Sequence, residues 1–302
     1  MVQSTTPIPK TRSSSSAVLT AAYLLPIISS SMLFPRLPNN ASHQVILVSP
    51  SLRTMYRAAC PRALISDDMF PQEKLFVSIP KAFERYPEGR FRFIHGTATE
   101  LDHIGRAISI NLAAGGTKKI EYHALVIATG ASLVVPLLGL TRDDVFLRAK
   151  WSEFRKAAKN IVIAGGGPAG IETAGELGEF LNGRAGWFTS KLENPNVHIT
   201  VVTAGTKIIP LLRPAIAKKA EEYLTKVGVT VLKNARIKIV EPHEAGTDNV
   251  ASKATLTLEG GKTLDADLYI PAIGTRPNTG FIDQSLLTAD GRVDTNSTLR
   301  VD

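Results

Sequence analysis

The 302-residue sequence has a single cysteine, Cys60, and this excludes several classes of site. One cysteine cannot form an internal disulfide, and it cannot supply a C-x-x-C or C-x-x-x-x-C redox pair. Dithiol–disulfide chemistry is therefore excluded within these residues, and any electron transfer must use another carrier.

Acidic residues are absent from the first part of the chain, where Asp67 is the earliest one. The formal net charge is +8, and six of the excess cations precede Asp67: Lys10, Arg12, Arg36, Arg53, Arg57 and Arg62. The remaining sequence is nearly balanced in charge, and it has no basic stripe interleaved with aromatic residues. We therefore predict no nucleic-acid partner.

The sequence also lacks an uninterrupted hydrophobic run of membrane-spanning length. Residues 1–16 are polar and rich in serine, so we expect a flexible start. The apolar stretch 17–34 is interrupted by Pro26 and barely reaches the length of a membrane span. We favour a core helix over Ala17–Leu25, with a signal peptide, a transit peptide or a membrane anchor as alternatives. The expected location is cytoplasmic or peripherally membrane-associated, with a mitochondrial one as the alternative.

Glycine does not occur before Gly89, but a later stretch concentrates it. Residues 160–177 have the pattern of a buried strand, a G-x-G-x-x-G turn and a helix, which is typical of a dinucleotide-binding loop. We expect Gly165 to turn the chain, Gly167 to let the backbone approach a pyrophosphate and Gly170 to let the helix pack closely. Pro168 suits the first turn of that helix, whose N-terminus favours a diphosphate. A glycine-rich turn without function is the weaker alternative, because an apolar strand and a helix flank the loop.

Strand and helix patterns alternate along the chain and predict an α/β fold. Strands are expected over 43–50, 120–128, 197–203, 229–232, 237–240, 254–258 and 264–270, with 91–96 and 107–112 as a small antiparallel arm. Helices are expected over 151–158 and 214–227, and Gly228 is the expected stop of the second one. With the glycine loop, the strands and helix between 160 and 232 would form a β-α-β-α-β unit.

Three separated signatures, Val126–Gly130, Gly165–Glu172 and Ala272–Asn278, occur in the order typical of flavoprotein reductases that bind two dinucleotides. With Val48–Pro50 and Cys60–Ala63, they make the chain resemble the fungal relatives of the apoptosis-inducing-factor-like, ferroptosis-suppressor proteins. Type II NADH dehydrogenases are wider kin of these proteins. The resemblance covers roughly residues 43–302, and the combination is more specific than the glycine loop alone.

This resemblance implies two Rossmann-like dinucleotide-binding domains, with the NAD(P)H domain inserted in a partial FAD domain. The implied boundaries are an N-terminal extension with an apolar helix at 1–43, a partial FAD-binding domain at 44–140, an NAD(P)H-binding domain at 141–272 and a return to the FAD domain at 273–302. The implied activity passes hydride from nicotinamide to flavin and on to a quinone or another small acceptor, with a tailoring role in a fungal biosynthetic pathway as one form of it. No metal site is implied, and the oligomeric state stays open.

The same resemblance implies which residues contact each cofactor. The contacts implied for NAD(P)H are Gly165, Gly166, Gly167, Pro168, Ala169, Gly170, Thr203 and Gly274. The contacts implied for FAD are Ser49, Arg62, Ala98, Thr129 and Gly130.

Three polar positions leave alternatives open. Glu172 matches a family glutamate near the place where flavin and nicotinamide stack, so it would position the hydride donor or relay a proton. A carboxylate in the first turns of a helix is also favourable beside the helix dipole without any chemistry. Thr203 stands where NAD-specific domains carry an acid, so the choice between NADH and NADPH is open. Lys207 is a candidate for a 2′-phosphate, with a solvated surface charge as the alternative.

Two departures from the family pattern concern FAD. No glycine is available for the first glycine loop. The serine run 13–16, which precedes the apolar stretch, stands where that loop is expected. Family members also carry a later Gly-Asp pair that holds the ribitol of the flavin, and the sequence up to Asp302 does not include such a pair. We therefore expect poor FAD retention. The alternative to an enzyme is a relative that binds NAD(P)H without stable flavin and is catalytically weak or serves as an interaction module.

Overall fold

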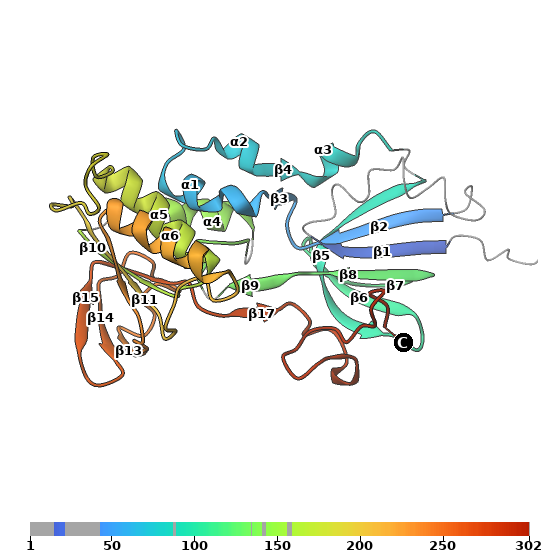
Figure 1. Cartoon of the computed structure of the whole chain (residues 1–302). Helices are drawn as coiled ribbons and strands as arrows, with labels where there is room; N and C mark the ends of the chain where they lie inside the picture. Colours follow the sequence, from blue (N-terminus) through green and yellow to red (C-terminus); the bar gives the residue numbers. More distant parts are fainter. Residues whose placement is uncertain are drawn as a thin grey trace, which may run out of the picture. The chain divides into compact units, whose positions relative to one another are not determined.

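The computed structural model describes residues 15–21, 43–86, 89–133, 135–140, 143–155 and 159–301. The chain divides into two compact units (Figure 1). Unit 1 comprises Met1–Leu52, Ile79–Gly130 and Thr279–Asp302, and unit 2 comprises Arg53–Ser78 and Ala131–Asn278. The domain boundaries expected from the sequence stay predictions, because compactness alone does not assign a cofactor to a unit.

Unit 1 is built on one mixed sheet. Its elements are β1 (Ser15–Ala21), β2 (His43–Ser49), α3 (Ile79–Phe83), β5 (Phe91–Asp102), β6 (Ala107–Leu112), β7 (Thr117–Glu121), β8 (Ala124–Ala128) and the 3₁₀ helix η4 (Gln284–Leu286). The strand order is β7-β6-β5-β2-β1-β8. Strands β1, β2, β8 and the first half of β5 run parallel, whereas β6 and β7 pair antiparallel.

The first strand corrects the core helix predicted over Ala17–Leu25. Residues 17–21 belong to β1, which pairs in parallel with β2 on one side and with β8 on the other. A short apolar run fits a helix and a buried strand equally well, and pairing along both edges decides for the strand. The predicted flexible start up to residue 14 and the rest of the apolar stretch, residues 22–34, lie outside the described residues.

Two other strands of unit 1 differ from the sequence-based expectation. The predicted arm strand 91–96 is only the first part of β5, which pairs in parallel with β2 and then continues antiparallel to β6. The predicted buried strand 120–128 divides into β7 and β8. Its second part is not fully buried, because the Val126 side chain is 42% exposed.

Unit 2 contains a parallel sheet with strand order β12-β11-β10-β16 and an antiparallel sheet with order β13-β14-β15. Its strands are β3 (Arg53–Met55), β4 (Phe76–Ser78), β9 (Ala131–Leu133), β10 (Asn160–Ala164), β11 (His198–Val202), β12 (Val229–Leu232), β13 (Ile237–Glu241), β14 (Ala254–Leu258), β15 (Thr263–Ala266), β16 (Leu268–Pro271) and β17 (Thr275–Pro277). Its helices are the 3₁₀ helix η3 (Arg57–Ala59), α1 (Cys60–Ile65), α2 (Gln72–Leu75), α4 (Asp144–Phe154), α5 (Pro168–Asn182) and α6 (Pro214–Lys226).

The parallel sheet of unit 2 is a layer covered on both faces. Ile161 and Ile163 of β10 pack in the same cluster as buried residues of α5 and α6. Val162 and Ala164 belong to a second cluster, which includes residues of β14 and β15. Successive side chains of a strand point to opposite faces, so the helices cover one face and the antiparallel sheet covers the other (Figure 1).

The elements β10, α5, β11, α6 and β12 form the β-α-β-α-β unit that the sequence predicts. Helix α5 begins at Pro168, and α6 ends at Lys226, just before Gly228 with a φ of 76°. Two boundaries differ. The helix predicted over 151–158 is α4, which begins at Asp144, and the strand predicted over 264–270 divides into β15 and β16.

Candidate functional site

The glycine loop joins β10 to α5 at the carboxyl edge of the parallel sheet. Gly165 follows β10 with a φ of 127°, which glycine adopts without the steric cost that a side chain would bring. A Cβ at this position would collide with the carbonyl group of Ala272. The Gly165 N–H donates to the Val202 carbonyl at 2.8 Å. The loop is therefore fixed between the ends of β11 and β16.

Gly167 and Gly170 have different surroundings. Gly170 lies in the first turn of α5, where a Cβ would collide with the Gly165 carbonyl oxygen. Gly167 is the N-cap of α5, and no described atom lies within 4 Å of a Cβ built there. The first N–H groups of a helix have no partner within the helix, and this end attracts anions. The geometry therefore offers open space at Gly167 for an anionic group.

Thr203 closes the glycine loop on the side of β11. Its side chain is buried, and a Cβ on Gly166 would lie 2.7 Å from the Thr203 Oγ1. The Ile209 N–H donates to the Gly166 carbonyl at 2.6 Å, so residues 203–209 lie against the loop. The contribution of Ile209 was missed from the sequence. Its φ of 45° is unusual for a branched side chain, and no local pattern signals it.

Gly274 lies in the segment that follows β16, two positions after the Ala272 that packs on Gly165. It has a φ of 70°, and the strand β17 that begins at the next residue pairs with β9. The structure thus brings the 272–274 segment to the glycine loop. The role of Gly274 toward a nicotinamide stays a prediction.

Three glutamates lie along one face of α5 at helical spacing: Glu172, Glu176 and Glu179. Loss of hydration raises the pKa of Glu172, and the carboxylate of Glu176 raises it further. Arg62 of α1 donates to Glu176 at 2.8 Å, and this hydrogen bond raises the pKa of Arg62. Burial and a short hydrogen bond to Glu179 raise the pKa of Tyr223 to about 12. The Arg62 side chain is 58% exposed and that of Glu176 is 24% exposed, so solvent screens this pair and it is worth at most about 1 kcal/mol.

The residues expected to contact FAD divide between the two units. Arg62 belongs to unit 2, whereas Ser49, Ala98, Thr129 and Gly130 belong to unit 1. Ser49 ends β2 and Thr129 follows β8, so both lie at the carboxyl edge of the parallel strands that flank β1. Ala98 lies in β5 beyond its parallel segment and packs beside a hydrophobic cluster.

The fit of an FAD pyrophosphate to unit 1 is incomplete. The strand order around β1 matches a dinucleotide-binding domain, and Gly130 has a φ of 66° at the expected edge. A first glycine loop belongs after β1, but residues 22–42 contain no glycine. That segment lies outside the described residues, so the sequence is the only observation, and it does not supply the backbone cradle.

Cys60 does not provide a reactive thiol. Its side chain is buried, its Sγ donates to the Leu137 carbonyl at 3.4 Å, and burial raises its pKa to about 12. The neutral thiol at physiological pH is a poor nucleophile. In the described part of the chain, no group of three or more His, Cys, Asp or Glu side chains is arranged to hold a metal ion.

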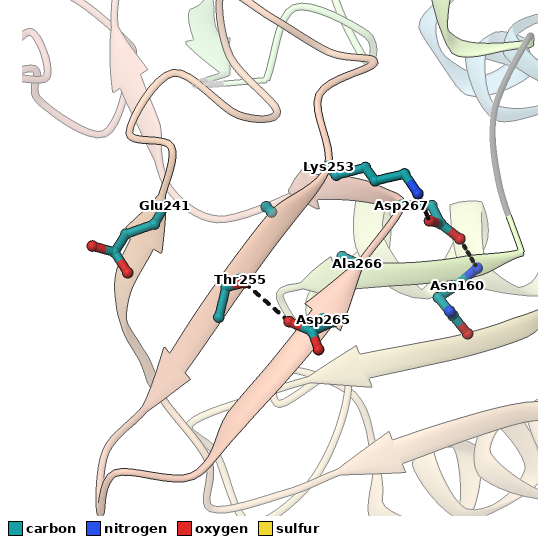
Figure 2. A pocket seen from close by; sticks show the side chains of 8 residues that line it. Asn160, Glu241, Lys253, Thr255, Asp265, Ala266 and Asp267 are labelled. Carbon is teal, nitrogen blue, oxygen red and sulfur yellow. Dashed lines mark hydrogen bonds and ion pairs between the residues drawn. The ribbon is translucent and has the colours of Figure 1, made fainter.

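A cavity of about 290 Å³ opens at the opposite end of β10 (Figure 2). Asp267 accepts from the N–H of Asn160 at 3.0 Å and pairs with Lys253 at 3.3 Å, and Thr255 donates to Asp265 at 2.9 Å. Asn160 is the first residue of β10, so the cavity lies at the amino end of a strand whose carboxyl end carries the glycine loop. The carboxylates of Asp265 and Asp267 bind neighbouring groups, and the cavity is separate from the glycine loop.

Among the described residues, no helix has the length and apolar character that crossing a bilayer requires.

Comparison with known proteins identifies relatives along most of the chain. A family model described as pyridine nucleotide-disulphide oxidoreductase matches residues 34–302. The chain is 60% identical over 287 residues to the oxidoreductase phnG of Penicillium herquei, covering 93% of this chain and 68% of that protein. It is 33% identical over 267 residues to the oxidoreductase ptaL of Pestalotiopsis fici, covering 86% of this chain and 66% of that protein.

Among solved structures, the water-forming NADH oxidase of Lactobacillus brevis bound to NADH is similar with a TM-score of 0.68. The two are 16% identical, and the match covers 92% of this chain and 58% of the oxidase. The chain thus spans about two thirds of its curated relatives and a little over half of this structural neighbour.

These likenesses support an α/β fold with two Rossmann-like dinucleotide-binding domains, and FAD and NAD(P)H as the cofactors of such proteins. The family name refers to a disulphide, which the single cysteine of this chain cannot form internally. On the extent of the family match and the identity to phnG, the chain belongs to the pyridine nucleotide-disulphide oxidoreductase family.

Proposed function

We propose that this chain binds NAD(P)H at the glycine loop and belongs to an NAD(P)H-dependent, FAD-linked oxidoreductase of the apoptosis-inducing-factor-like type. In that activity, hydride passes from the nicotinamide to the flavin and then to a quinone or another small acceptor. A tailoring step in a fungal biosynthetic pathway fits the fungal relatives phnG and ptaL, which are both named oxidoreductases. The cofactors supply the redox chemistry, and the protein holds and orients them.

The open space at Gly167 carries this proposal. A pyrophosphate needs close contact with backbone N–H groups at a helix N-terminus, and a side chain would occupy that space. At Gly165, Gly166 and Gly170 a Cβ would collide with the protein itself, whereas at Gly167 it would meet no described atom. The loop is therefore packed internally at three glycines and open at the fourth, where the ligand would lie.

The other predicted contacts are arranged around this point. Pro168 and Ala169 begin α5 beside the pyrophosphate position. Thr203 would face the adenosine ribose at the end of β11, and Gly274 would approach the nicotinamide. Ala272 packs against Gly165, and this contact brings the segment before Gly274 to the loop. The contact therefore supports the assignment of Gly274 to the nicotinamide.

We further propose that the chain accepts NADPH. In NAD-specific Rossmann domains, an acid after the second strand binds the ribose and repels a 2′-phosphate. Here that position is Thr203, and no acid occurs from there to Glu221. Lys207 lies four positions after Thr203, and its ammonium group donates a hydrogen bond to the Leu212 carbonyl at 3.3 Å. A 2′-phosphate could replace that weak neutral partner.

Two roles remain for Glu172. A carboxyl whose pKa is raised keeps its proton closer to neutral pH, and this favours a proton relay beside the nicotinamide. A carboxylate early in α5 also stabilises the helix dipole. Loss of hydration and the Glu176 carboxylate raise the pKa, and neither cause argues against the helix-dipole role.

A second candidate is a relative that binds NAD(P)H without stable flavin, with weak catalysis or a role in interactions. The absence of glycine before Gly89 favours it. Calorimetric titration of the purified chain with NADH and NADPH tests the shared part of both proposals, and flavin content separates them. No binding of either nucleotide would overturn both.

A further inference from the structure

Two adjacent aromatic residues protrude from unit 2 far from the glycine loop in sequence. Trp187 is 93% exposed and Phe188 is 99% exposed, in the segment between α5 and β11. Tryptophan and phenylalanine are usually well buried, because each covers a large apolar area. A pair that is almost fully exposed on a segment held by hydrogen bonds indicates a surface that contacts a partner outside the chain.

The base of this segment is firmly attached to the end of α6. The Ala185 N–H donates to the Lys226 carbonyl at 2.8 Å, and the Leu192 N–H donates to the Thr225 carbonyl at 3.3 Å. The last carbonyls of a helix have no partner within the helix. The Ala185 N–H therefore pairs with a free helix end at Lys226, whereas the Thr225 carbonyl also accepts from the Gly228 N–H at 3.2 Å. The side chain of Asn182 adds hydrogen bonds to the Val197 N–H at 2.8 Å and to the Val227 carbonyl at 3.2 Å.

The tip of the segment is a closed turn. The Thr189 N–H donates to the Gly186 carbonyl at 3.0 Å, and the Thr189 hydroxyl donates to the same carbonyl at 2.9 Å. Trp187 and Phe188 are the two central residues of this turn. Hydrogen bonds close both the base and the tip of the segment, and the backbone presents the two rings to solvent.

The charges beside the turn are mainly positive. Arg184 and Lys191 flank it and are exposed, and Glu193 is the only acid between residues 183 and 196. The Arg184 guanidinium lies 5.1 Å from the centre of the Tyr223 ring, which anchors it beside the base of the segment. In the sequence, the aromatic tip therefore has a cation on each side, and Arg184 shares the Tyr223 ring with the Glu179 carboxylate.

We propose that the 184–191 turn is a shallow membrane anchor, which inserts Trp187 and Phe188 into the interface of a bilayer that contains anionic lipids. Aromatic rings are favoured at the level of the lipid headgroups, and nearby Lys and Arg are attracted to anionic lipids. A stable protein interface needs roughly 800 Å² from each partner and about 20 residues a side. Two rings on a protruding turn supply little of that area, but they are sufficient to enter a lipid surface. The inference is independent of the proposed redox function.

The test is flotation of the full chain with phosphatidylcholine vesicles that contain about one third phosphatidylserine. Trp151 and Trp187 are the two tryptophans, and Trp151 is fully buried, so a vesicle-induced blue shift of the emission reports on Trp187. We expect the chain to float with these vesicles and the emission to shift to shorter wavelength. Failure to float, or an unchanged spectrum, would overturn the anchor.

The variant Trp187→Ser/Phe188→Ser should lose at least tenfold in vesicle affinity and keep its circular dichroism spectrum. The matched control is Ile104→Ser/Leu299→Ser, which removes two apolar residues of similar exposure elsewhere and should bind vesicles like the parent chain. Equal losses in both double variants, or none in the first, would contradict the assignment. Replacing Arg184 and Lys191 with glutamine should weaken binding by about fivefold per cation, with vesicles that lack anionic lipid unaffected.

Discussion

The Oγ1 atom of Thr203 lies 2.7 Å from the place that a Cβ on Gly166 would occupy. The Thr203 side chain, at the end of β11, therefore fills the space beside Gly166 in the glycine loop. A larger side chain at either residue would displace the other. This contact links the residue expected to choose the coenzyme with the loop expected to hold its pyrophosphate.

Thr203→Asp should shift coenzyme preference toward NADH. An aspartate at this place can accept from the ribose hydroxyls and repels a 2′-phosphate. We expect the ratio of the NADPH to the NADH dissociation constant to rise at least tenfold, measured by calorimetry. Thr203→Ser is the control and should leave the ratio unchanged. A Thr203→Asp ratio equal to that of the parent chain would refute the ribose assignment.

Gly167→Val should abolish most nucleotide binding without unfolding the protein. A Cβ at Gly167 meets no described atom, so the folded chain has room for the side chain that a pyrophosphate would have to displace. We expect at least a tenfold loss of affinity for NADH and NADPH with an unchanged circular dichroism spectrum. Gly280→Val adds the same side chain at another open glycine and should not affect binding. Equal affinity in both variants would refute the site.

Gly170→Ala should mainly affect stability. Its Cβ would collide with the Gly165 carbonyl oxygen, and this contact is backbone that cannot move independently of the loop. Overpacking of this kind costs about 1–3 kcal/mol. Urea unfolding followed by circular dichroism should show a lower midpoint for Gly170→Ala than for Gly167→Ala. If Gly167→Ala is the less stable of the two, the packing order described for the loop is wrong.

The raised pKa of Glu172 predicts a pH dependence of stability. The folded state binds the Glu172 proton more tightly than the unfolded state, so this contribution is present at low pH and is lost as pH rises above the ordinary glutamate pKa of about 4.3. Glu172→Gln removes the ionisation. Its free energy of unfolding relative to the parent chain should therefore increase from pH 4 to pH 7. A flat difference for Glu172→Gln would argue against the raised pKa.

The purified 302-residue chain should contain little FAD. The serine run 13–16 does not form the first phosphate loop, because Ser15 and Ser16 belong to β1. The loop belongs after β1, where residues 22–42 contain no glycine, and a residue with a Cβ disfavours positive φ angles and adds bulk against the phosphate. We expect a largely colourless protein with little NAD(P)H oxidation even when FAD is added, measured by absorption spectroscopy and cofactor extraction. Flavin close to one per chain would show that another segment rebuilds the first pyrophosphate site.

The parts of the fold that could be predicted are those with local signals. Gly165, Pro168 and Gly228 mark the turn, the start of α5 and the end of α6, and each fixes a boundary by its own backbone preference. The predicted strand Val229–Leu232 agrees with β12 residue for residue. These elements are determined by residues within a few positions of one another.

The parts that could not be predicted depend on distant pairing. The apolar residues of β1 become a strand because β2 and β8 hydrogen-bond to both of its edges, and β8 begins at Ala124. The length of β5 depends on two partners of opposite direction. In the candidate site, the sequence indicates the glycines but not the contact of Ile209 with Gly166 or of Ala272 with Gly165. No pattern within a short window contains that information.

The division of unit 1 into three stretches of sequence affects the order in which a growing chain can fold. The Leu101 N–H donates to the Phe281 carbonyl at 2.8 Å, so β5 receives one of its neighbours from the last stretch, Thr279–Asp302. A ribosome adds about 5–20 residues per second and completes all of unit 2, which ends at Asn278, before it reaches Phe281. The sequence of unit 2 is therefore complete while β5 of unit 1 still lacks the hydrogen-bond partner that Phe281 supplies.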